Sequence, residues 1–288
     1  MILGDSTATA APGGRGPTGA VHGRGPGIAL DLGSARTRVW AQGMGDILDV
    51  PTVTHQGSAA ARPVRRGTVV DPAGATRLVS RLLADRVPHD VRPVVVVTAP
   101  VLSGPRPHTA AVGVLQVLPP RAVLTIDGVR AAALGAGADL SGALLVIDVG
   151  AQLSEVALLT DGRVAAARRA TMGTDDVRAG ALAELVTAVT TMVTGLLRDD
   201  PRPAYADALD RGPLLVGGGA LRPEVAYRLS ARLRSHVRAV PRPQTAAVRG
   251  AVAALHSVLR HPALNPTRPL PPLSPLPSLP SPPPLPPL

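Results

Sequence analysis

The sequence predicts an α/β fold built of two similar lobes that face each other across a cleft. One pattern, an apolar strand ending in Asp, a turn at Gly and a second apolar strand, occurs at residues 28–41 and again at 144–159. The run Val94–Val97 has no polar alternation, which is typical of a strand buried on both faces inside an α/β sheet. Two copies of one pattern more than a hundred residues apart indicate a single ligand held from both sides.

The turn in each copy carries the chemistry. A glycine turn exposes backbone N–H groups that can cradle phosphate. The aspartate at the strand end, Asp31 in the first copy and Asp148 in the second, can hold a hydrated divalent cation beside that phosphate. The paired pattern therefore predicts a nucleotide cleft.

Apolar periodicity predicts the regular elements in order along the chain. The strands are expected at 28–32, 37–41, 47–50, 94–98, 123–126, 144–148, 154–159, 163–168 and 213–217. The helices are expected at 75–86, 176–197 and 223–238, each with apolar residues at three-and-four spacing. The last helix carries arginines on its other faces, and a solvated face is favoured over a binding surface: Arg228, Arg232, Arg234 and Arg238.

Four regions follow from composition. Residues 1–26 are rich in Gly, Ala, Thr and Pro and are expected to be disordered, and residues 263–288 form a Pro-rich disordered tail. Between them we expect one lobe over 27–140 and a second over 141–262. The PxxP spacing of the tail suits an aromatic groove of a partner protein, and an unselected low-complexity tail is the favoured alternative.

Composition and charge exclude several classes of protein. The chain has no Cys, so it forms neither disulfides nor thiolate metal sites. Its net charge of +10 comes from arginines spread along the chain without interleaved aromatic residues, which argues against a specific nucleic-acid partner. No apolar run approaches the roughly 20 residues that span a bilayer, and no secretory signal is present. A cytoplasmic location is expected.

A third glycine motif follows the second copy of the repeated pattern. Residues 214–216 form a short apolar strand, which runs into Gly217, Gly218 and Gly219 before a helix. Consecutive glycines let the backbone approach a ligand where side chains would collide, and the following helix N-terminus favours negative charge. This motif is placed to meet the nucleoside of the predicted ligand.

The order of these motifs resembles the actin-like ATPase superfamily, and its details resemble the MreB/Mbl-type bacterial actins. The resemblance is carried by Ile28–Thr37, Arg62–Asp71, Ala131–Gly137, Asp148–Glu155, Met172–Asp176 and Asp210–Leu221. It implies two ribonuclease-H-like core lobes, with a helix over 131–137, around a cleft for ATP and Mg²⁺. It also implies a role in cell shape and cell-wall morphogenesis, close to the inner face of the membrane.

The resemblance assigns individual residues to the cleft. The residues implied in nucleotide binding are Asp31, Gly33, Ser34, Arg36, Thr37, Asp148, Gly150, Ser154, Gly217, Gly218 and Gly219. Asp31 and Asp148 would hold magnesium through water. Arg36 replaces an asparagine of the family, and two roles stay open for it: pairing with phosphate, or facing solvent.

The chain also departs from the family pattern. The interval from Thr52 to Arg62 is short, so subdomain IB is expected to be deleted or reduced to a loop, and subdomain IIB is expected to be absent after Asp176. The position of the family's catalytic glutamate is occupied by Gly128 in this chain. Its neighbour Asp127 is the remaining catalytic candidate, although a turn residue is the favoured interpretation. Side chains at 151–153 would crowd phosphate where the family has bare backbone.

These departures predict weak or lost binding of ATP and Mg²⁺ and negligible hydrolysis. We therefore expect an accessory or scaffold in cell-wall morphogenesis or sporulation. Its partners would be a full-length actin-like filament protein or other morphogenesis proteins, with peripheral membrane association left open. The alternative is a minimal active ATPase or a small kinase, for which the acidic candidates are Asp127, Asp139 and Glu155.

Overall fold

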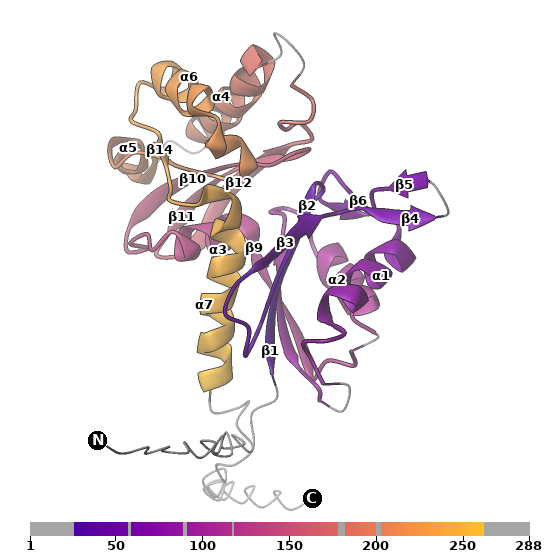
Figure 1. The fold of residues 1–288 in the computed structure, drawn as a ribbon. Coiled ribbons are helices and arrows are strands. Elements are labelled where there is room, and N and C mark those ends of the chain that lie inside the picture. Colours follow the sequence, from indigo (N-terminus) through magenta and orange to yellow (C-terminus); the bar gives the residue numbers. More distant parts are fainter. Residues whose placement is uncertain are drawn as a thin grey trace, which may run out of the picture.

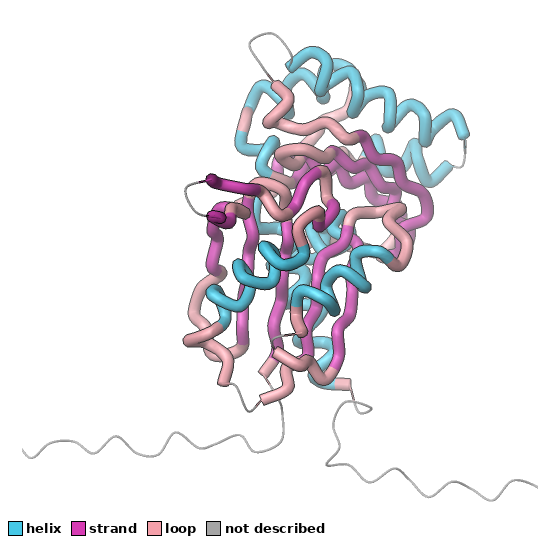
Figure 2. Tube along the Cα trace, turned by 90° about the vertical axis from the view of Figure 1, so that its right-hand side faces the viewer, coloured by secondary structure: helices cyan, strands magenta, loops and turns pink. Residues whose placement is uncertain are grey.

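A computed structural model describes residues 26–56, 59–88, 91–116, 118–177, 182–199 and 203–261. The predictions for residues 1–25 and for the Pro-rich tail from residue 262 lie outside these ranges. Figures 1 and 2 show two lobes, one above the other, each built around its own twisted sheet.

The first lobe contains a five-stranded mixed sheet in the order β3-β2-β1-β8-β9. Strands β1, β2 and β3 form an antiparallel meander, while β8 and β9 run parallel to β1. The bounds of the five strands are β1 Gly27–Leu32, β2 Arg36–Ala41, β3 Leu48–Pro51, β8 Val94–Ala99 and β9 Ala122–Asp127. The strand predicted from the valine run is β8, which lies inside the sheet with its first four residues buried.

The second lobe repeats this topology in the order β12-β11-β10-β13-β14. Again a three-stranded antiparallel meander is extended by two parallel strands. The bounds are β10 Ala143–Val149, β11 Ser154–Thr160, β12 Arg163–Ala170, β13 Leu214–Val216 and β14 Arg238–Ala239. The repeated sequence pattern therefore reflects a repeated fold, and the prediction of two α/β lobes is confirmed.

Helices connect the parallel strands and cover the sheets. Their bounds are α1 Pro72–Leu83, α2 Arg106–Val114, α3 Gly128–Gly135, α4 Leu182–Asp199, α5 Pro203–Asp210, α6 Pro223–Leu233 and α7 Ala246–Arg260, with 3₁₀ turns η1 Gly218–Leu221 and η2 Pro243–Thr245. Within the described ranges, none of these helices combines the length and the hydropathy needed to cross a membrane.

All three helices predicted at 75–86, 176–197 and 223–238 have different bounds in the structure, and the second of them is α4, Leu182–Asp199. Helix α1 starts at Pro72 because Asp71 caps it, accepting a hydrogen bond from the Gly74 amide at 2.8 Å. Helix α6 ends at Leu233, where Arg234 adopts a left-handed backbone (φ 49°) and the chain turns into β14. Arg238 therefore lies in a strand, not on the helix face where we expected it.

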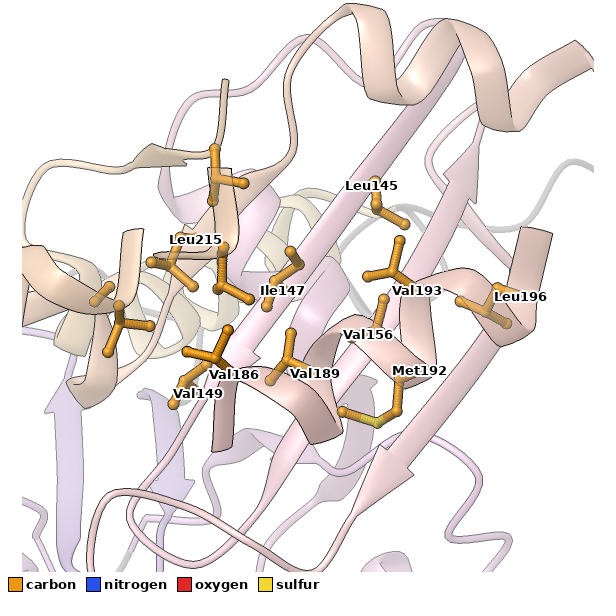
Figure 3. Close-up of a cluster of buried hydrophobic side chains, with 14 of the residues drawn as sticks. Leu145, Ile147, Val149, Val156, Val186, Val189, Met192, Val193, Leu196 and Leu215 are labelled. Atoms are coloured by element: carbon orange, nitrogen blue, oxygen red, sulfur yellow. The ribbon is translucent and has the colours of Figure 1, made fainter. Parts of the chain in front are cut away.

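The core of the second lobe lies between its sheet and α4. Valines of α4 interdigitate with aliphatic side chains of β10 and β11 (Figure 3). The labelled members of this cluster are Leu145, Ile147, Val149, Val156, Val186, Val189, Met192, Val193, Leu196 and Leu215. The chain has no Phe, so the cohesion comes from many small aliphatic groups, each worth roughly 1.5–3 kcal/mol when fully buried.

The two lobes exchange a helix each. Helix α3 follows the first sheet in the chain but packs on the second through Val129 and its neighbours. Helix α7 follows the second sheet but packs on β1 and β8 of the first through Val248, Ala251 and Leu255 (Figure 1). Each sheet is therefore covered in part by a helix from the other half of the chain.

Glycines allow the exchanged helices to cross closely. A Cβ built on Gly135 would lie 1.9 Å from the carbonyl oxygen of Ala246, and one on Gly250 would lie 1.7 Å from that of Ala131. Real Cβ atoms do not come this near to backbone oxygen, so neither position has room for a side chain. This crossing joins the two lobes at the base of the cleft.

The interval expected to be a loop in place of subdomain IB contains strands. Strand β4 (Thr54–Gln56) pairs with β5 (Ala59–Ala61), and β6 (Val64–Arg65) pairs with β7 (Thr68–Val69). The interval from Thr52 to Arg62 thus contains one small hairpin, and a second hairpin follows it, whose turn at Arg66 and Gly67 reaches the cleft.

Candidate functional site

The two Asp-Gly turns have the same geometry. The Gly33 amide donates to the carbonyl of Arg36 at 3.1 Å, and the Gly150 amide donates to the carbonyl of Leu153 at 2.9 Å. A Cβ on either glycine would lie within 2.8 Å of that same carbonyl oxygen. Each turn therefore requires glycine, and the sequence repeat is a repeat of one backbone conformation.

The turns face each other across a cleft between the lobes. Of the residues implied by the resemblance, the cleft is lined by Asp31, Gly33, Ser34, Arg36, Asp148, Gly150, Gly217 and Gly218. It is also lined by residues that we had not assigned to nucleotide binding, among them Arg38, Gly67, Thr98, Gly128, Gln152, Leu153, Glu155 and Gln244. Sequence motifs from both lobes are thus brought together at one site.

Three of the implied residues contribute to the fold instead of the cleft surface. The Thr37 hydroxyl is buried and lies 2.9 Å from that of Thr52, and Ser154 donates to the carbonyl of Met172 at 2.8 Å. Thr37 directly precedes Arg38 in β2, and Ser154 directly precedes Glu155 in β11. Because successive side chains of a strand point to opposite faces, Thr37 and Ser154 point away from the face that carries Arg38 and Glu155. Gly219 is buried against Val149, where a Cβ would lie 2.3 Å from Cγ1.

Asp127 ends β9 and is not among the residues that line the cleft, whereas its neighbour Gly128 is. Burial raises the pKa of the Asp127 carboxyl, and the charge of Arg130 opposes this rise. A Cβ on Gly128 would meet only the carbonyl oxygen of Ala99, at 3.6 Å. The cleft therefore has a position for a longer side chain at residue 128, and the chain leaves that position empty.

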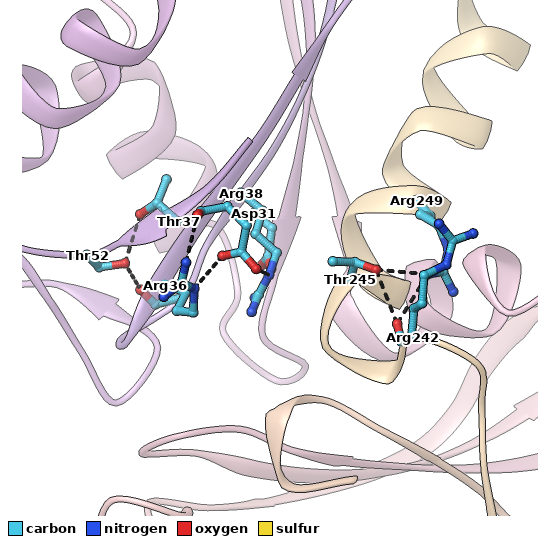
Figure 4. Close-up of polar contacts among 10 residues, drawn as sticks. Asp31, Arg36, Thr37, Arg38, Thr52, Arg242, Thr245 and Arg249 are labelled. Carbon is cyan, nitrogen blue, oxygen red and sulfur yellow. Dashed lines mark hydrogen bonds and ion pairs between the residues drawn. The ribbon is translucent and has the colours of Figure 1, made fainter. Parts of the chain in front are cut away.

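Asp31, on the first-lobe wall of the cleft, has both carboxylate oxygens engaged, and Figure 4 shows its partner Arg38 beside it. Its Oδ1 accepts a hydrogen bond from Thr98 at 2.7 Å, and its Oδ2 lies 3.3 Å from Nη1 of Arg38. Arg38 also contacts Oδ2 of Asp49 through Nε at 3.2 Å. Arg36 is paired with Asp49 as well, with Nε 2.5 Å from Oδ1, and its side chain remains 43% exposed.

The second-lobe wall contains two carboxyl groups with raised pKa values. Burial raises the pKa of Asp148 to about 7, the charge of Asp31 adds to this, and Arg38 opposes it. Burial raises the pKa of Glu155 to about 8, and Asp148 adds to this. The Val101 amide, which donates to Glu155 Oε1 at 2.6 Å, and Arg169 both oppose the rise.

Side chains of the second turn contact the first lobe across the cleft mouth. The Arg66 amide donates to Oε1 of Gln152 at 3.2 Å, and Leu153 packs over Gly67. The Gly67 amide in turn donates to the Ser34 hydroxyl at 3.2 Å. The side chains at 152 and 153 therefore fill space near the turns and link the lobes.

Two ion pairs continue this link outside the turns. Arg62 Nη1 lies 2.6 Å from Oδ2 of Asp175, and Arg66 Nη2 lies 3.4 Å from Oδ1 of Asp176. Both arginines belong to the first lobe and both aspartates to the second. No sequence signal joins these residues, because more than a hundred positions separate them along the chain.

The far end of the cleft is formed by the triple-glycine segment and η2. Gly217 has a left-handed backbone (φ 82°), and a Cβ there would lie 2.2 Å from Oδ1 of Asp148. Gly218 has open space beside it. Gln244 lines the same end, and its Oε1 is buried without a hydrogen-bond partner among the described residues. The bare backbone at Gly217 and Gly218 leaves room for a ligand at this end of the cleft.

Comparison with known proteins gives the family. A model of the MreB/Mbl protein family matches residues 53–180 and 165–261, which is most of the chain. The chain belongs to the MreB/Mbl family. No curated protein matches the sequence.

Solved structures show the same fold. MreB5 of Spiroplasma citri, in a crystal structure with bound ADP, is 16% identical with a TM-score of 0.72, and the match covers 82% of this chain and 97% of that one. In its structure bound to AMPPNP, the identity is 15%, the TM-score is 0.73, and the match covers 81% and 96%. The ethanolamine utilization protein EutJ from Carboxydothermus hydrogenoformans is 18% identical with a TM-score of 0.51, covering 78% and 88%.

Proposed function

We propose that this MreB/Mbl family member is a cytoskeletal accessory or scaffold whose nucleotide cleft binds ATP weakly or not at all and does not hydrolyse it. The observation that carries this proposal is Gly128, which lines the cleft where the family resemblance puts the catalytic glutamate. Glycine can neither orient nor deprotonate water. Asp127, beside it, is not part of the cleft lining.

The second turn supports the same conclusion. Phosphoryl transfer depends on positioning and on electrostatic stabilisation of the phosphate. In this chain Gln152 and Leu153 occupy the turn that would surround the phosphate, and they are engaged with Arg66 and Gly67 of the other lobe. A nucleotide would have to displace these contacts, which weakens binding.

The reduced small lobe supports an accessory role over independent filament formation. Two short hairpins replace a full subdomain between Thr52 and Asp71. A stable protein interface buries about 1,600 Å² in total, and loss of a lobe removes area from the lengthwise contact of a filament. Binding to the filament of a full-length relative, in cell-wall morphogenesis or sporulation at the inner face of the membrane, suits such a chain.

The alternative is a minimal ATPase or a small kinase, and one observation favours it. Glu155 lines the cleft, and burial raises the pKa of its carboxyl to about 8, near the working range of a general acid or base. Its Oε1 is however bonded to the Val101 amide. Asp139 is exposed and paired with Arg211 at 3.0 Å, and it does not line the cleft.

Co-sedimentation tests the accessory role. Purified protein is mixed at micromolar concentration with filaments of a full-length family member and then pelleted, with a sample lacking filaments as the control. We expect the protein in the pellet only when filaments are present. Complete absence from the filament pellet would overturn the accessory role, and pelleting without filaments would show independent assembly.

A further inference from the structure

We propose that the cleft binds the phosphate groups of its nucleotide without a divalent cation, because the Arg38 guanidinium supplies the positive charge that magnesium would otherwise bring. This inference rests on the residual nucleotide binding of the proposed function. It starts from the two aspartates that the family resemblance assigns to magnesium, Asp31 and Asp148.

Asp31 does not fit a magnesium site in this chain. A hydrated magnesium ion is held by carboxylates whose lone pairs are available to the ion's water ligands. Here one oxygen of Asp31 accepts from Thr98 and the other pairs with Arg38 at 3.3 Å. A divalent cation at this carboxylate would lie next to the guanidinium, and the two positive charges would repel each other.

The rest of the cleft offers no substitute. In the described ranges, no group of three or more His, Asp or Glu side chains is arranged to hold a metal ion. Asp148 stands on the opposite wall, and the charge of Arg38 acts on it as well as on Asp31. The charge of one arginine therefore acts on both aspartates, in direct contact with Asp31 and without a direct bond to Asp148 among the described residues.

Arg38 has the geometry of an anion-binding residue. It is the cross-strand neighbour of Asp31 in the first turn motif, as Glu155 is of Asp148 in the second. Its side chain is only 12% exposed, and that part contributes to the cleft lining. Its contacts to Asp31 and Asp49 use Nη1 and Nε, and Nη2 makes no bond to a described residue. A planar guanidinium with a remaining donor suits a phosphate oxygen.

A consequence follows for the charge state of the ligand. Magnesium bound to ATP reduces the negative charge of the nucleotide and occupies phosphate oxygens. A site whose cation is a fixed arginine therefore prefers the metal-free nucleotide, and added magnesium competes with Arg38 for the same oxygens. The expected dependence on magnesium is the reverse of that of a metal-assisted site.

The test is isothermal titration of the full chain with ATP, in EDTA and in excess Mg²⁺. Tripolyphosphate serves as a second probe, which separates a nucleotide site from a site for free phosphate. The variant Arg38→Met keeps an unbranched apolar stem and removes the guanidinium with its charge. Arg81→Met is the matched control, because Arg81 is exposed at the end of α1 and does not line the cleft.

We expect ATP to bind in EDTA at least as tightly as in Mg²⁺. Arg38→Met should weaken binding in EDTA by about tenfold or more, as loss of a charge-assisted contact does, whereas Arg81→Met should leave it unchanged. Arg38→Met should also make binding depend on Mg²⁺, because it frees Asp31. This gain of metal dependence cannot come from simple loss of folding.

Two results would overturn the inference: ATP binding by the wild-type chain only in Mg²⁺, or no binding of either probe in EDTA. Both are read on the wild-type chain, so they do not depend on how the variant folds. Binding of tripolyphosphate but not ATP in EDTA would uphold the role of Arg38 as an anion-binding residue and overturn the nucleotide part of this inference, while agreeing with a proposed function in which ATP is not bound at all. The co-sedimentation result, which tests the accessory role, is independent of all these outcomes.

Discussion

Glu155 of the second lobe accepts a hydrogen bond from the Val101 amide of the first lobe at 2.6 Å. The glutamate is 6% exposed and stands beside Asp148 on the adjacent strand. A buried carboxyl thus connects the end of β8 to β11, directly at the cleft. Among the described residues, the contacts that join the lobes include this bond, the crossing of α3 with α7, and the contacts of Arg62 and Arg66.

Glu155→Gln should stabilise the protein at alkaline pH. Glutamine keeps the acceptor for the Val101 amide but has no charge to bury. The pKa of Glu155 rises from 4.5 to about 8 on folding, so below pH 4.5 both folded and unfolded states are protonated and the cost is absent. As pH rises toward 8 the unfolded state loses its proton first, and the wild type loses stability on the order of a few kcal/mol.

Urea unfolding from pH 5 to pH 9 measures this effect. The stability difference between Glu155→Gln and the wild type should grow with pH and level off above pH 8. Glu184→Gln is the control, since Glu184 is exposed on α4. A constant difference across the range would show that Glu155 is ionised throughout.

Gly250→Ala should destabilise the protein strongly. The new Cβ would lie 1.7 Å from the carbonyl oxygen of Ala131, and only separation of α3 from α7 could make room. The expected loss is at least about 1–3 kcal/mol, the usual cost of overpacking. Gly113→Ala in α2 is the matched control because nothing lies within 4 Å of its Cβ. That variant should gain up to about 1 kcal/mol, and equal effects of the two on thermal unfolding would refute the close crossing.

Arg62→Ala combined with Arg66→Ala should loosen the cleft mouth with little effect on global stability. Half-exposed ion pairs such as Arg62 with Asp175 are worth about 0–1 kcal/mol each. Hydrogen exchange should nevertheless speed up at the Gly67 amide, which bonds to Ser34 at the mouth. Arg77→Ala, on the outer face of α1, is the control. Unchanged exchange at Gly67 would show that these contacts do not hold the mouth closed.

Gln244→Met should have opposite effects on stability and on ligand binding. The buried Oε1 of Gln244 has no partner among the described residues, and removing such an atom stabilises a fold by up to about 1–3 kcal/mol. The same change replaces a polar side chain that lines the cleft with an apolar one. Thermal unfolding without ligand should therefore rise while nucleotide affinity falls, and a fall in both would assign Gln244 to the fold alone.

Nine of the ten strands in the two large sheets were predictable because their signals are local, whereas β14 and the short strands β4 to β7 were not predicted. The Asp31 and Asp148 motifs each combine an apolar strand with a glycine turn within ten residues, and Val94–Val97 is an uninterrupted β-branched run. Helices α2, α5 and α7 were not predicted. In α2, Pro and Gly break the pattern, and α7 is rich in Ala, whose small side chain gives weak periodicity.

The cleft was predictable in outline, but its polar contacts were not. Glycines mark the turns because only they fit there. Which face of its strand a side chain occupies depends on the strand register, which the local sequence does not give. Thr37 and Ser154 were therefore assigned to the ligand, although both are buried. Arg38 was not assigned to the cleft, and the signal that could have identified it is a charged residue inside a largely buried strand. The pairing of Arg62 with Asp175 depends on how the lobes are placed, which no local pattern reports.

Phosphate release from ATP by the purified full chain, measured beside a full-length family member in the same Mg²⁺ buffer, tests the central claim most directly. That claim is a cleft without a water-orienting carboxylate at residue 128. The account predicts release at the rate of the protein-free buffer. A turnover comparable to that of the full-length relative would contradict it.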